Sequence, residues 1–345
     1  MKPSPDFARI RKTLLCGQAD RVPIAELKVD PHVMSAFMGR SIKTLQDNVD
    51  FWLAAGYDYI RIRPKYDYHT AGAQARTGEY SAYGDKTDSR KWAPTHGGVI
   101  QSDEDFERFP LPRPQDIDYS TVEQVAKLLP EGMKLISGCT GIYESVWMLM
   151  GFEGFSMALA ENPGLVERMF QKIGELHYNM IRTVAAMEHV GAIWYTDDIA
   201  YTEGLIVSPT IYRKHLFPWM RKIKAVCRER DLPLLFHSDG DLWQVMDDLI
   251  EIGVNALHPI EPKAMDIAEV KRRVGRKLCL IGNIDLGYTL TRGTPEEVRA
   301  EVRERIRTCA PGGGYCVGSS NTVTNYVPLA NYQAMIEASR EFGTY

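Results

Sequence analysis

The sequence has no excess of charge of either sign. Its 345 residues include 41 Lys and Arg against 45 Asp and Glu, a formal net charge of −4. Proteins that bind nucleic acid concentrate basic residues, because phosphate contacts supply most of their affinity. The near-neutral balance excludes a global basic excess, and we expect no nucleic-acid partner.

Paired cysteines and long apolar segments are also missing. The first six residues contain no apolar run of the kind that an export signal needs, and no stretch reaches the ~18 apolar residues of a membrane helix. The sequence has no Cys-x-x-Cys pair, and its cysteines are scattered: Cys16, Cys139, Cys227, Cys279, Cys309 and Cys316. We therefore expect a cytoplasmic protein with reduced thiols and no membrane partner.

The chain has no sequence repeat, but short β-branched runs alternate with segments of helical period. The runs predict eight strands, at residues 22–27, 57–63, 134–139, 192–198, 232–239, 256–261, 277–285 and 313–321. The intervening segments predict helices at residues 43–55, 148–160, 163–189, 209–230, 242–253, 266–274, 294–310 and 329–342.

Strands and helices in strict alternation require parallel strands with right-handed crossovers. Eight such units close into a (β/α)8 TIM barrel, so we predict an α/β protein with a single barrel domain over residues 1–345. The surplus residues fit an N-terminal helical extension at residues 7–16 and a long insertion after the second strand, at about residues 64–115. An open, doubly wound sheet is the structural alternative.

In a barrel of this type, active sites lie at the carboxyl ends of the strands. Polar side chains follow the apolar runs at those ends, among them acids, imidazoles and amides. We expect His237 and Asp239, with Asp197 and Asp198, to form the catalytic group. The expected substrate contacts are Glu26, Arg63, Tyr143, Glu144, His258, Glu261, Asn283, Asp285, Ser319 and Asn321.

The spacing of the catalytic candidates suggests their chemistry. His237 and Asp239 stand at i and i+2 of a strand, so both side chains face the same side. Two adjacent carboxylates, Asp197 and Asp198, can bind a metal or a substrate cation, or supply a general base. Simple structural roles stay open, because Asp197 and Asp198 could cap the next helix and His258 could be fixed by the turn at Pro259. Among the remaining histidines, only His32 and His69 are candidates for the site.

Several segments from residue 135 onward resemble the uroporphyrinogen decarboxylase superfamily, and in particular its branch of cobamide-dependent methyltransferases. The clearest are LLFHSDGDLWQVMDDLIEIGVNALHPIEP, LCLIGNIDLGYTLTRGTPEEVRAEVRERI and GGGYCVGSSNTVTNYVPLANYQAMIEA. The resemblance implies a (β/α)8 barrel, in agreement with the strand count. It also implies one of two reactions, decarboxylation of a porphyrinogen or methyl transfer.

Departures from the family pattern bear on both reactions. The decarboxylase carries an Arg-Gln-Ala-Gly-Arg segment that handles substrate carboxylates, and this chain has Arg21 to Lys28 (RVPIAELK) in that place. The methyltransferase branch has a zinc site of the form His-x-Cys with a later Cys. Here His237 matches the first position, Asp239 replaces the Cys, and Cys316 comes several residues too early. The resemblance then implies, at most, an oxygen-rich metal site of His237, Asp239 and one of Glu144 or Glu261, with loss of the metal as the alternative.

The leading hypothesis is methyl transfer from a small methylated donor, such as an aromatic methyl ether, to a corrinoid carried by a separate protein, with zinc as a possible cofactor. An aromatic-rich stretch could form a lid over the donor or the corrin ring: Tyr57, Tyr59, Tyr66, Tyr68, Tyr80, Tyr83 and Trp92. Porphyrinogen decarboxylation and a non-catalytic ligand-binding barrel are the alternatives. The resemblance is compatible with a monomer or a homodimer.

Overall fold

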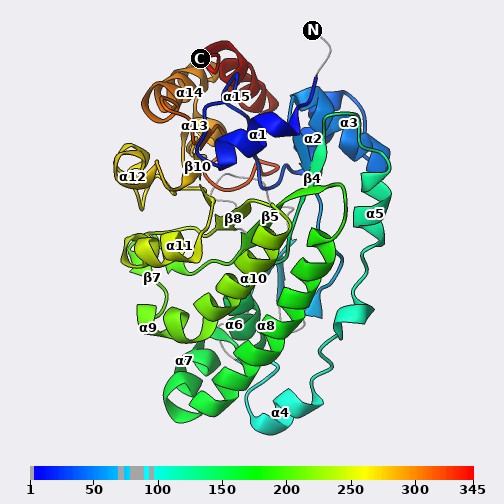
Figure 1. Cartoon of the computed structure of the whole chain (residues 1–345), viewed down its shortest axis with the longest axis vertical. Coiled ribbons are helices and arrows are strands. Elements are labelled where there is room, and N and C mark those ends of the chain that lie inside the picture. The colour runs from blue at the N-terminus through cyan, green and yellow to red at the C-terminus, as the bar shows by residue number, and fades with distance from the viewer. Residues whose placement is uncertain (1–3, 69–73, 78–88, 93–96) are drawn as a thin grey trace.

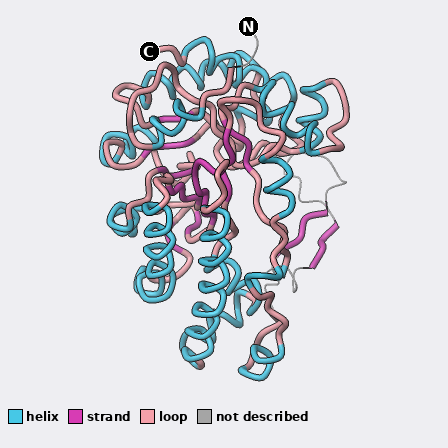
Figure 2. Tube along the Cα trace, turned by 45° about the vertical axis from the view of Figure 1, so that its right-hand side comes forward, coloured by secondary structure: helices cyan, strands magenta, loops and turns pink. Residues whose placement is uncertain are grey.

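A curled parallel sheet surrounded by helices forms the centre of the protein (Figures 1 and 2). The structure is a computed structural model that describes residues 4–68, 74–77, 89–92 and 97–345. The sheet has seven strands in the order β1-β4-β5-β8-β9-β10-β11. Their bounds are β1 Tyr59–Arg61, β4 Lys134–Ser137, β5 Val190–Thr196, β8 Leu234–His237, β9 Ala256–His258, β10 Cys279–Ile281 and β11 Tyr315–Cys316. All neighbours in the sheet are parallel, which confirms the predicted α/β barrel.

The first of the eight predicted strands is not a regular strand. Residues 22–29 run beside β11 and the residues after it through isolated parallel bridges, Ile24 to Val317 and Val29 to Val323. Pro23 has no N–H to donate, which interrupts a ladder here. Toward β1, the Tyr59 hydroxyl donates to the Glu26 carbonyl at 2.6 Å and accepts from the Glu26 N–H at 2.8 Å. A tyrosine side chain thus binds the backbone groups of Glu26 where the sheet closes.

The main helices follow the prediction closely. They are α1 Phe7–Leu14, α3 Leu45–Ala55, α8 Pro163–Ala185, α10 Phe217–Glu229, α11 Met246–Ile252, α12 Ile267–Val274, α14 Pro295–Cys309 and α15 Leu329–Phe342. Local signals explain their starts. Asn162 caps α8, whose first residue is a proline, and Thr294 and Glu297 form a capping box on α14.

Two predicted helices are interrupted. The segment 148–160 belongs to α6 (Ile142–Met150) and α7 (Phe152–Glu161), which are separated at Gly151, where φ is +74°. The segment 209–230 divides into α9 (Pro209–Ile211), a π-helical turn η3 (Tyr212–Leu216) and α10. Pro218 at the start of α10 lacks an N–H, so regular α-helical bonding cannot continue through that turn.

Several short elements were not predicted. They are α2 Pro31–Met38, α4 Asp103–Arg108, η2 Pro114–Asp116, α5 Ser120–Ala126, α13 Thr289–Arg292 and two antiparallel hairpins, β2 Gln74–Thr77 with β3 Ser89–Trp92 and β6 Ala200–Tyr201 with β7 Gly204–Leu205. The 3₁₀ turn η4 Trp243–Val245 begins the helix predicted at residues 242–253. The β2–β3 hairpin, α4 and η2 lie within the predicted insertion. None of the described helices is long and apolar enough to cross a membrane.

The register of the sheet determines which side chains share its inner face. Thr196, His237 and His258 are paired across β5, β8 and β9, so their side chains lie on the same face. Trp194 lies two residues before Thr196 and therefore faces the same way. Its ring contacts both Tyr59 and His258, at centroid distances of 6.4 and 5.2 Å, which identifies this face as the barrel interior.

Candidate active site

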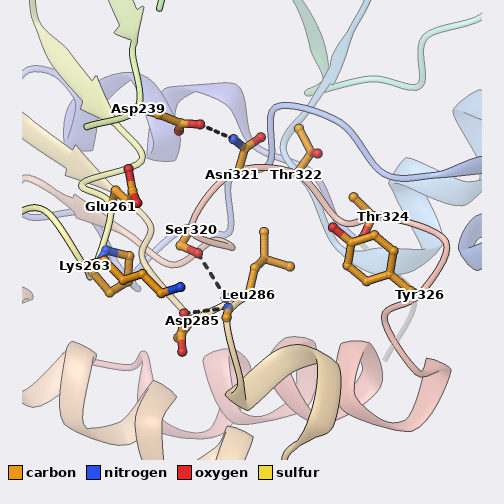
Figure 3. Close-up of a pocket in the computed structure, with 12 residues that line it drawn as sticks. Asp239, Glu261, Lys263, Asp285, Leu286, Ser320, Asn321, Thr322, Thr324 and Tyr326 are labelled. Atoms are coloured by element: carbon orange, nitrogen blue, oxygen red, sulfur yellow. Dashed lines mark hydrogen bonds between the residues drawn. The ribbon is translucent and has the colours of Figure 1, made fainter. Parts of the chain in front are cut away.

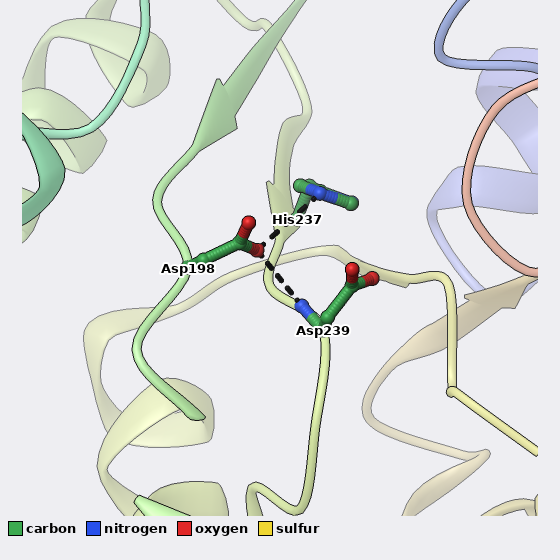
Figure 4. A group of neighbouring side chains, drawn as sticks. All are labelled: Asp198, His237 and Asp239. Carbon is green, nitrogen blue, oxygen red and sulfur yellow. Dashed lines mark hydrogen bonds and ion pairs between the residues drawn. The ribbon is translucent and has the colours of Figure 1, made fainter. Parts of the chain in front are cut away.

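Three side chains meet at the carboxyl ends of β5 and β8 (Figure 4). One ligand atom from each of Asp198, His237 and Asp239 lies within 4.8 Å of the others. Asp198 Oδ1 accepts the backbone N–H of Asp239 at 3.0 Å and lies 3.5 Å from His237 Nε2. The expected cluster is therefore present, with Asp198 in it and partly open to solvent (38% exposed side chain).

A second imidazole orients His237. Nδ1 of His237 and Nδ1 of His258 are 2.8 Å apart, and both rings are buried. Burial lowers the pKa of both histidines, and the nearby Arg61 charge lowers both further. The two rings are therefore neutral at physiological pH, so one Nδ1 donates its proton to the other.

Asp239 is the most perturbed acid of the cluster. Its Oδ2 accepts a hydrogen bond from Asn321 Nδ2 at 2.6 Å, and its Oδ1 has no hydrogen-bond partner among the described residues. Burial, with Asp198 and Glu261 nearby, raises the pKa of Asp239 to about 8. Without a bound cation, the Asp239 carboxyl group thus carries a proton at neutral pH.

Two cavities meet at Asp239 and Glu261. One has a volume of about 310 Å³ (Figure 3), and the other, of about 520 Å³, is lined by the β6–β7 hairpin. Glu261 accepts hydrogen bonds from the Gly240 N–H at 3.0 Å and the Thr202 hydroxyl at 2.9 Å. The smaller cavity is also lined by Pro262, Lys263, Asp285, Leu286, Gly287, Ser320, Asn321, Thr322, Thr324 and Tyr326. The predicted contacts Glu261, Asp285 and Asn321 thus lie together at a cavity.

Asp197 is bound within the fold and does not belong to the cluster of Asp198, His237 and Asp239. Its carboxylate is buried and accepts the N–H groups of Tyr143 (3.0 Å) and Glu144 (2.9 Å) in the first turn of α6, and the Tyr195 hydroxyl (2.6 Å). A side chain at Gly141 would collide with this carboxylate. Burial still raises the pKa of Asp197 to about 7. The adjacent acids are therefore divided, Asp197 capping a helix and Asp198 facing the cluster.

The two predicted substrate contacts on α6, Tyr143 and Glu144, differ from each other in burial. Tyr143 is buried against Tyr212 and Phe155, with ring centroids 5.1 and 5.6 Å away, and is a core residue instead of a substrate contact. Glu144 is half-buried, and burial together with the Asp198 and Asp197 charges raises its pKa well above the ordinary range. Glu144 therefore belongs to the edge of the acidic cluster.

Glu26, Ser319 and Asn283 are interior residues and line neither cavity. Glu26 accepts the Ser319 N–H and hydroxyl, each at 2.7 Å, and Asn283 Nδ2 donates to the Ile260 carbonyl at 2.7 Å. All three side chains are buried. Their predicted role as substrate contacts is replaced by support of the loops, since Ser319 directly precedes two cavity residues.

The predicted aromatic lid is wrong for its first members. Tyr57 is a core residue whose hydroxyl is hydrogen-bonded to the Tyr332 hydroxyl at 2.9 Å. The Tyr59 hydroxyl is bound to the backbone of Glu26. Tyr66 accepts the Thr140 N–H at 2.6 Å, and Tyr68 contacts His177. Tyr80, Tyr83 and the side chain of Trp92 lie outside the described residues.

The other predicted contacts lie apart from the cavities. Arg63 is exposed, with its guanidinium carbon 5.8 Å from the centre of the Tyr66 ring. His32 is exposed and contacts Asp30, which caps α2. His69 lies outside the described residues.

No cysteine belongs to the cluster in the described part of the chain. All six cysteines are free, and Cys316 is buried in β11. Burial raises the pKa of Cys139, the cysteine that follows β4, so this thiol keeps its proton. The donor atoms of the cluster are therefore nitrogen and oxygen.

Sequence reasoning missed several residues that line the cavities or approach the cluster. Lys263, Thr202 and Tyr326 lie at the cavities, and Trp194 faces the interior beside the two histidines. Of the alternating pair Arg61 and Arg63, the predicted contact Arg63 is exposed, and Arg61 faces the Trp194 ring. Lys263 follows a strand and could have been selected on that signal. Thr202 belongs to a short hairpin, for which the sequence contains no periodic pattern.

Comparisons with known proteins agree with the barrel. The family model described as "Uroporphyrinogen decarboxylase (URO-D)" matches residues 88–342. The uroporphyrinogen decarboxylases of Pseudomonas aeruginosa and Coxiella burnetii are 28% and 26% identical to this chain, over 70% and 72% of it and over 69% and 71% of their own length. A solved methyltransferase from Methanosarcina mazei has a TM-score of 0.69 at 17% identity, covering 97% of this chain and 98% of that one. The likeness to this methyltransferase is a likeness of fold.

Proposed function

Because the chain belongs to the uroporphyrinogen decarboxylase family, as its resemblance predicts, we propose that it is an enzyme that transfers a methyl group from a small methylated donor to a corrinoid on a separate protein. The convergence of Asp198, His237 and Asp239 beside a cavity carries this proposal. When a methyl group leaves an oxygen atom, the bonding electron pair stays on that oxygen. A proton or a cation at the oxygen stabilises the charge that develops.

The donor set of the cluster can be compared with the metal that the resemblance implies. It fits a divalent cation with nitrogen and oxygen ligands, because the three ligand atoms are within 4.8 Å and Asp239 Oδ1 has no partner in the described chain. It does not fit a thiolate zinc site. A divalent cation held by Asp198, His237 and Asp239 would polarise the leaving oxygen of the donor.

The side chains themselves contribute orientation and a proton. His258 holds the His237 ring through the 2.8 Å contact, and this is the arrangement in which a ligating histidine is usually fixed. Without a cation, Asp239 holds a proton that it can donate to the leaving oxygen. Asp198 is partly exposed and stands beside both groups, where it orients the donor.

The cavity favours a small donor. Its volume of about 310 Å³ is near the lower limit for sites that enclose a drug-sized ligand, ~300–1,000 Å³. Ser320, Thr322, Thr324 and Tyr326 line it and supply hydroxyl groups around the donor. A methoxylated aromatic ring is of suitable size, whereas a tetrapyrrole is much larger.

Porphyrinogen decarboxylation is the second candidate. The decarboxylases that are 28% identical over 70% of the chain favour it. The acidic groups Asp198 and Glu261 count against it, because like charges repel a substrate with many carboxylates. The segment RVPIAELK also lacks the paired arginines of the decarboxylase.

Replacement of His237 tests the proposal. We expect His237→Ala to reduce methyl transfer to cob(I)alamin by about a hundredfold or more. The variant loses a ligand of the cation at the leaving oxygen, and loss of one group that stabilises such an oxygen costs roughly 10²- to 10³-fold. The absorbance change on formation of methylcobalamin measures the rate. His189→Ala, at an exposed histidine, is the matched control. Unchanged transfer by His237→Ala would remove the cluster from the reaction.

A further inference from the structure

Three buried nitrogen atoms beside the cluster lack hydrogen-bond partners. They are Nε of Arg61, Nε1 of Trp194 and Nε2 of His258, and none has a partner in the part of the chain that the structure describes. Their side chains form one group. The Arg61 guanidinium carbon is 5.9 Å from the centre of the Trp194 ring, and the Trp194 and His258 rings meet edge to face at 5.2 Å.

Arg61 is the unusual member of this group. Enclosed arginines normally pair with carboxylates, because an unpaired buried charge loses its hydration without compensation. No ion pair or hydrogen bond of Arg61 occurs within the described ranges, and the charged group near it is a second cation, Arg63. The side chain is half-buried, so solvent and ligands still reach it.

The site of the proton on His258 determines whether its Nε2 is also a hydrogen-bond donor. A divalent cation bound at His237 Nε2 leaves the His237 proton on Nδ1, which then donates to His258 Nδ1. His258 then carries its own proton on Nε2. Arginine Nε, tryptophan Nε1 and this Nε2 are all donors, so the group presents three N–H bonds and no acceptor.

We propose that Arg61, Trp194 and His258 bind a carboxylate group of the methyl donor. The inference rests on the proposed function and specifies its substrate class, a small methylated carboxylic acid. The guanidinium fork matches a carboxylate, and Trp194 provides both an N–H and an apolar face for the rest of the molecule. His258 connects this group to His237, and His237 connects it to Asp198 in the cluster.

Calorimetric titration of the whole protein with 2-methoxybenzoate and with the uncharged 2-methoxybenzamide tests this inference without a corrinoid. We expect the carboxylate to bind at least tenfold more tightly than the amide. Arg61→Gln should weaken carboxylate binding about ten- to hundredfold and leave amide binding unchanged, as for the loss of hydrogen bonds to a charged group. Arg307→Gln, at an exposed arginine of α14, removes the same charge far from the histidines and should bind like the unmodified protein.

Stability separates a binding role from a structural one. Because Arg61 has no partner to lose within the described chain, Arg61→Gln should unfold at the same temperature as the unmodified protein or higher. The carboxylate should raise the unfolding temperature of the unmodified protein but not of the variant. Equal binding of acid and amide, an acid preference that survives in Arg61→Gln, or a lower unfolding temperature of the ligand-free variant would each overturn the proposal. Carboxylate binding through Arg61 without methyl transfer would contradict the proposed reaction but would still support the carboxylate site.

Discussion

The charged residues at the two ends of strand β1 differ in whether they have an ion-pair partner in the described structure. Asp58 precedes the strand and is buried, and Arg9 from α1 binds it at 2.5 Å and also binds Asp20 at 2.7 Å. Arg61 ends the same strand, and it has no ion pair among the described residues. The charge at the amino end of β1 is thus paired within the chain, whereas the charge at its carboxyl end has no partner in the described residues. This division agrees with the general placement of active sites in the fold.

The largest expected effect is at the paired end. Arg9→Met leaves Asp58 buried without its cation, so we expect a loss of about 3–5 kcal/mol in the free energy of unfolding. Urea denaturation measures it. Arg11→Met on the same helix removes an exposed pair with Asp231 and should cost about 1 kcal/mol or less. Equal losses in the two variants would show that Arg9 is not a structural partner of Asp58.

A smaller effect is expected where the charges are unpaired. A divalent cation such as zinc should stabilise the protein through Asp198, His237 and Asp239, by about 2.7 kcal/mol at a concentration of 100 times Kd. Thermal unfolding with and without the cation measures this. Asp198→Asn should lose the stabilisation, and Asp103→Asn, at an exposed acid on α4, should keep it. A shift that persists in Asp198→Asn would place the cation elsewhere.

The smallest effect concerns Glu26, which lies between the two ends. Burial raises its pKa from 4.5 to about 8, so the folded protein holds a proton that the unfolded chain releases. The stabilisation by this proton is full below pH 4.5 and is lost as the pH rises through about 8. Glu26→Gln has no such proton, so between pH 7 and 9 it should gain about 1.4 kcal/mol relative to the unmodified protein. Parallel stability curves for the two proteins across that range would show that Glu26 is already ionised.

The sequence predicts the barrel well because alternating apolar runs and caps are local signals. Seven of the eight predicted runs contain strands of the sheet, and Pro23 explains why the first does not. The site is less predictable because it depends on the directions in which the side chains of adjacent residues point. Asp197 and Asp198 are neighbours in sequence, yet only the absence of a side chain at Gly141 lets Asp197 turn to cap α6.

Partners across the barrel are likewise hidden in the sequence. The pairing of His237 with His258 depends on the strand register, and so does the position of Arg61, which has no partner among the residues that the structure describes. The sequence places both histidines at strand ends without indicating that they meet. Of the predicted contacts, those on loops beside the cavity, such as Asp285 and Asn321, line it, whereas the buried residues Glu26, Asn283 and Ser319 support the loops.

The choice between the two family reactions is tested most directly by comparing products from one preparation of the protein. It would be incubated with cob(I)alamin and a methoxylated carboxylic acid in one vessel, and with uroporphyrinogen in another. We expect methylcobalamin in the first vessel, at a rate abolished by His237→Ala, and no coproporphyrinogen in the second. Coproporphyrinogen without methylcobalamin would contradict methyl transfer and assign the cluster at Asp198, His237 and Asp239 to decarboxylation.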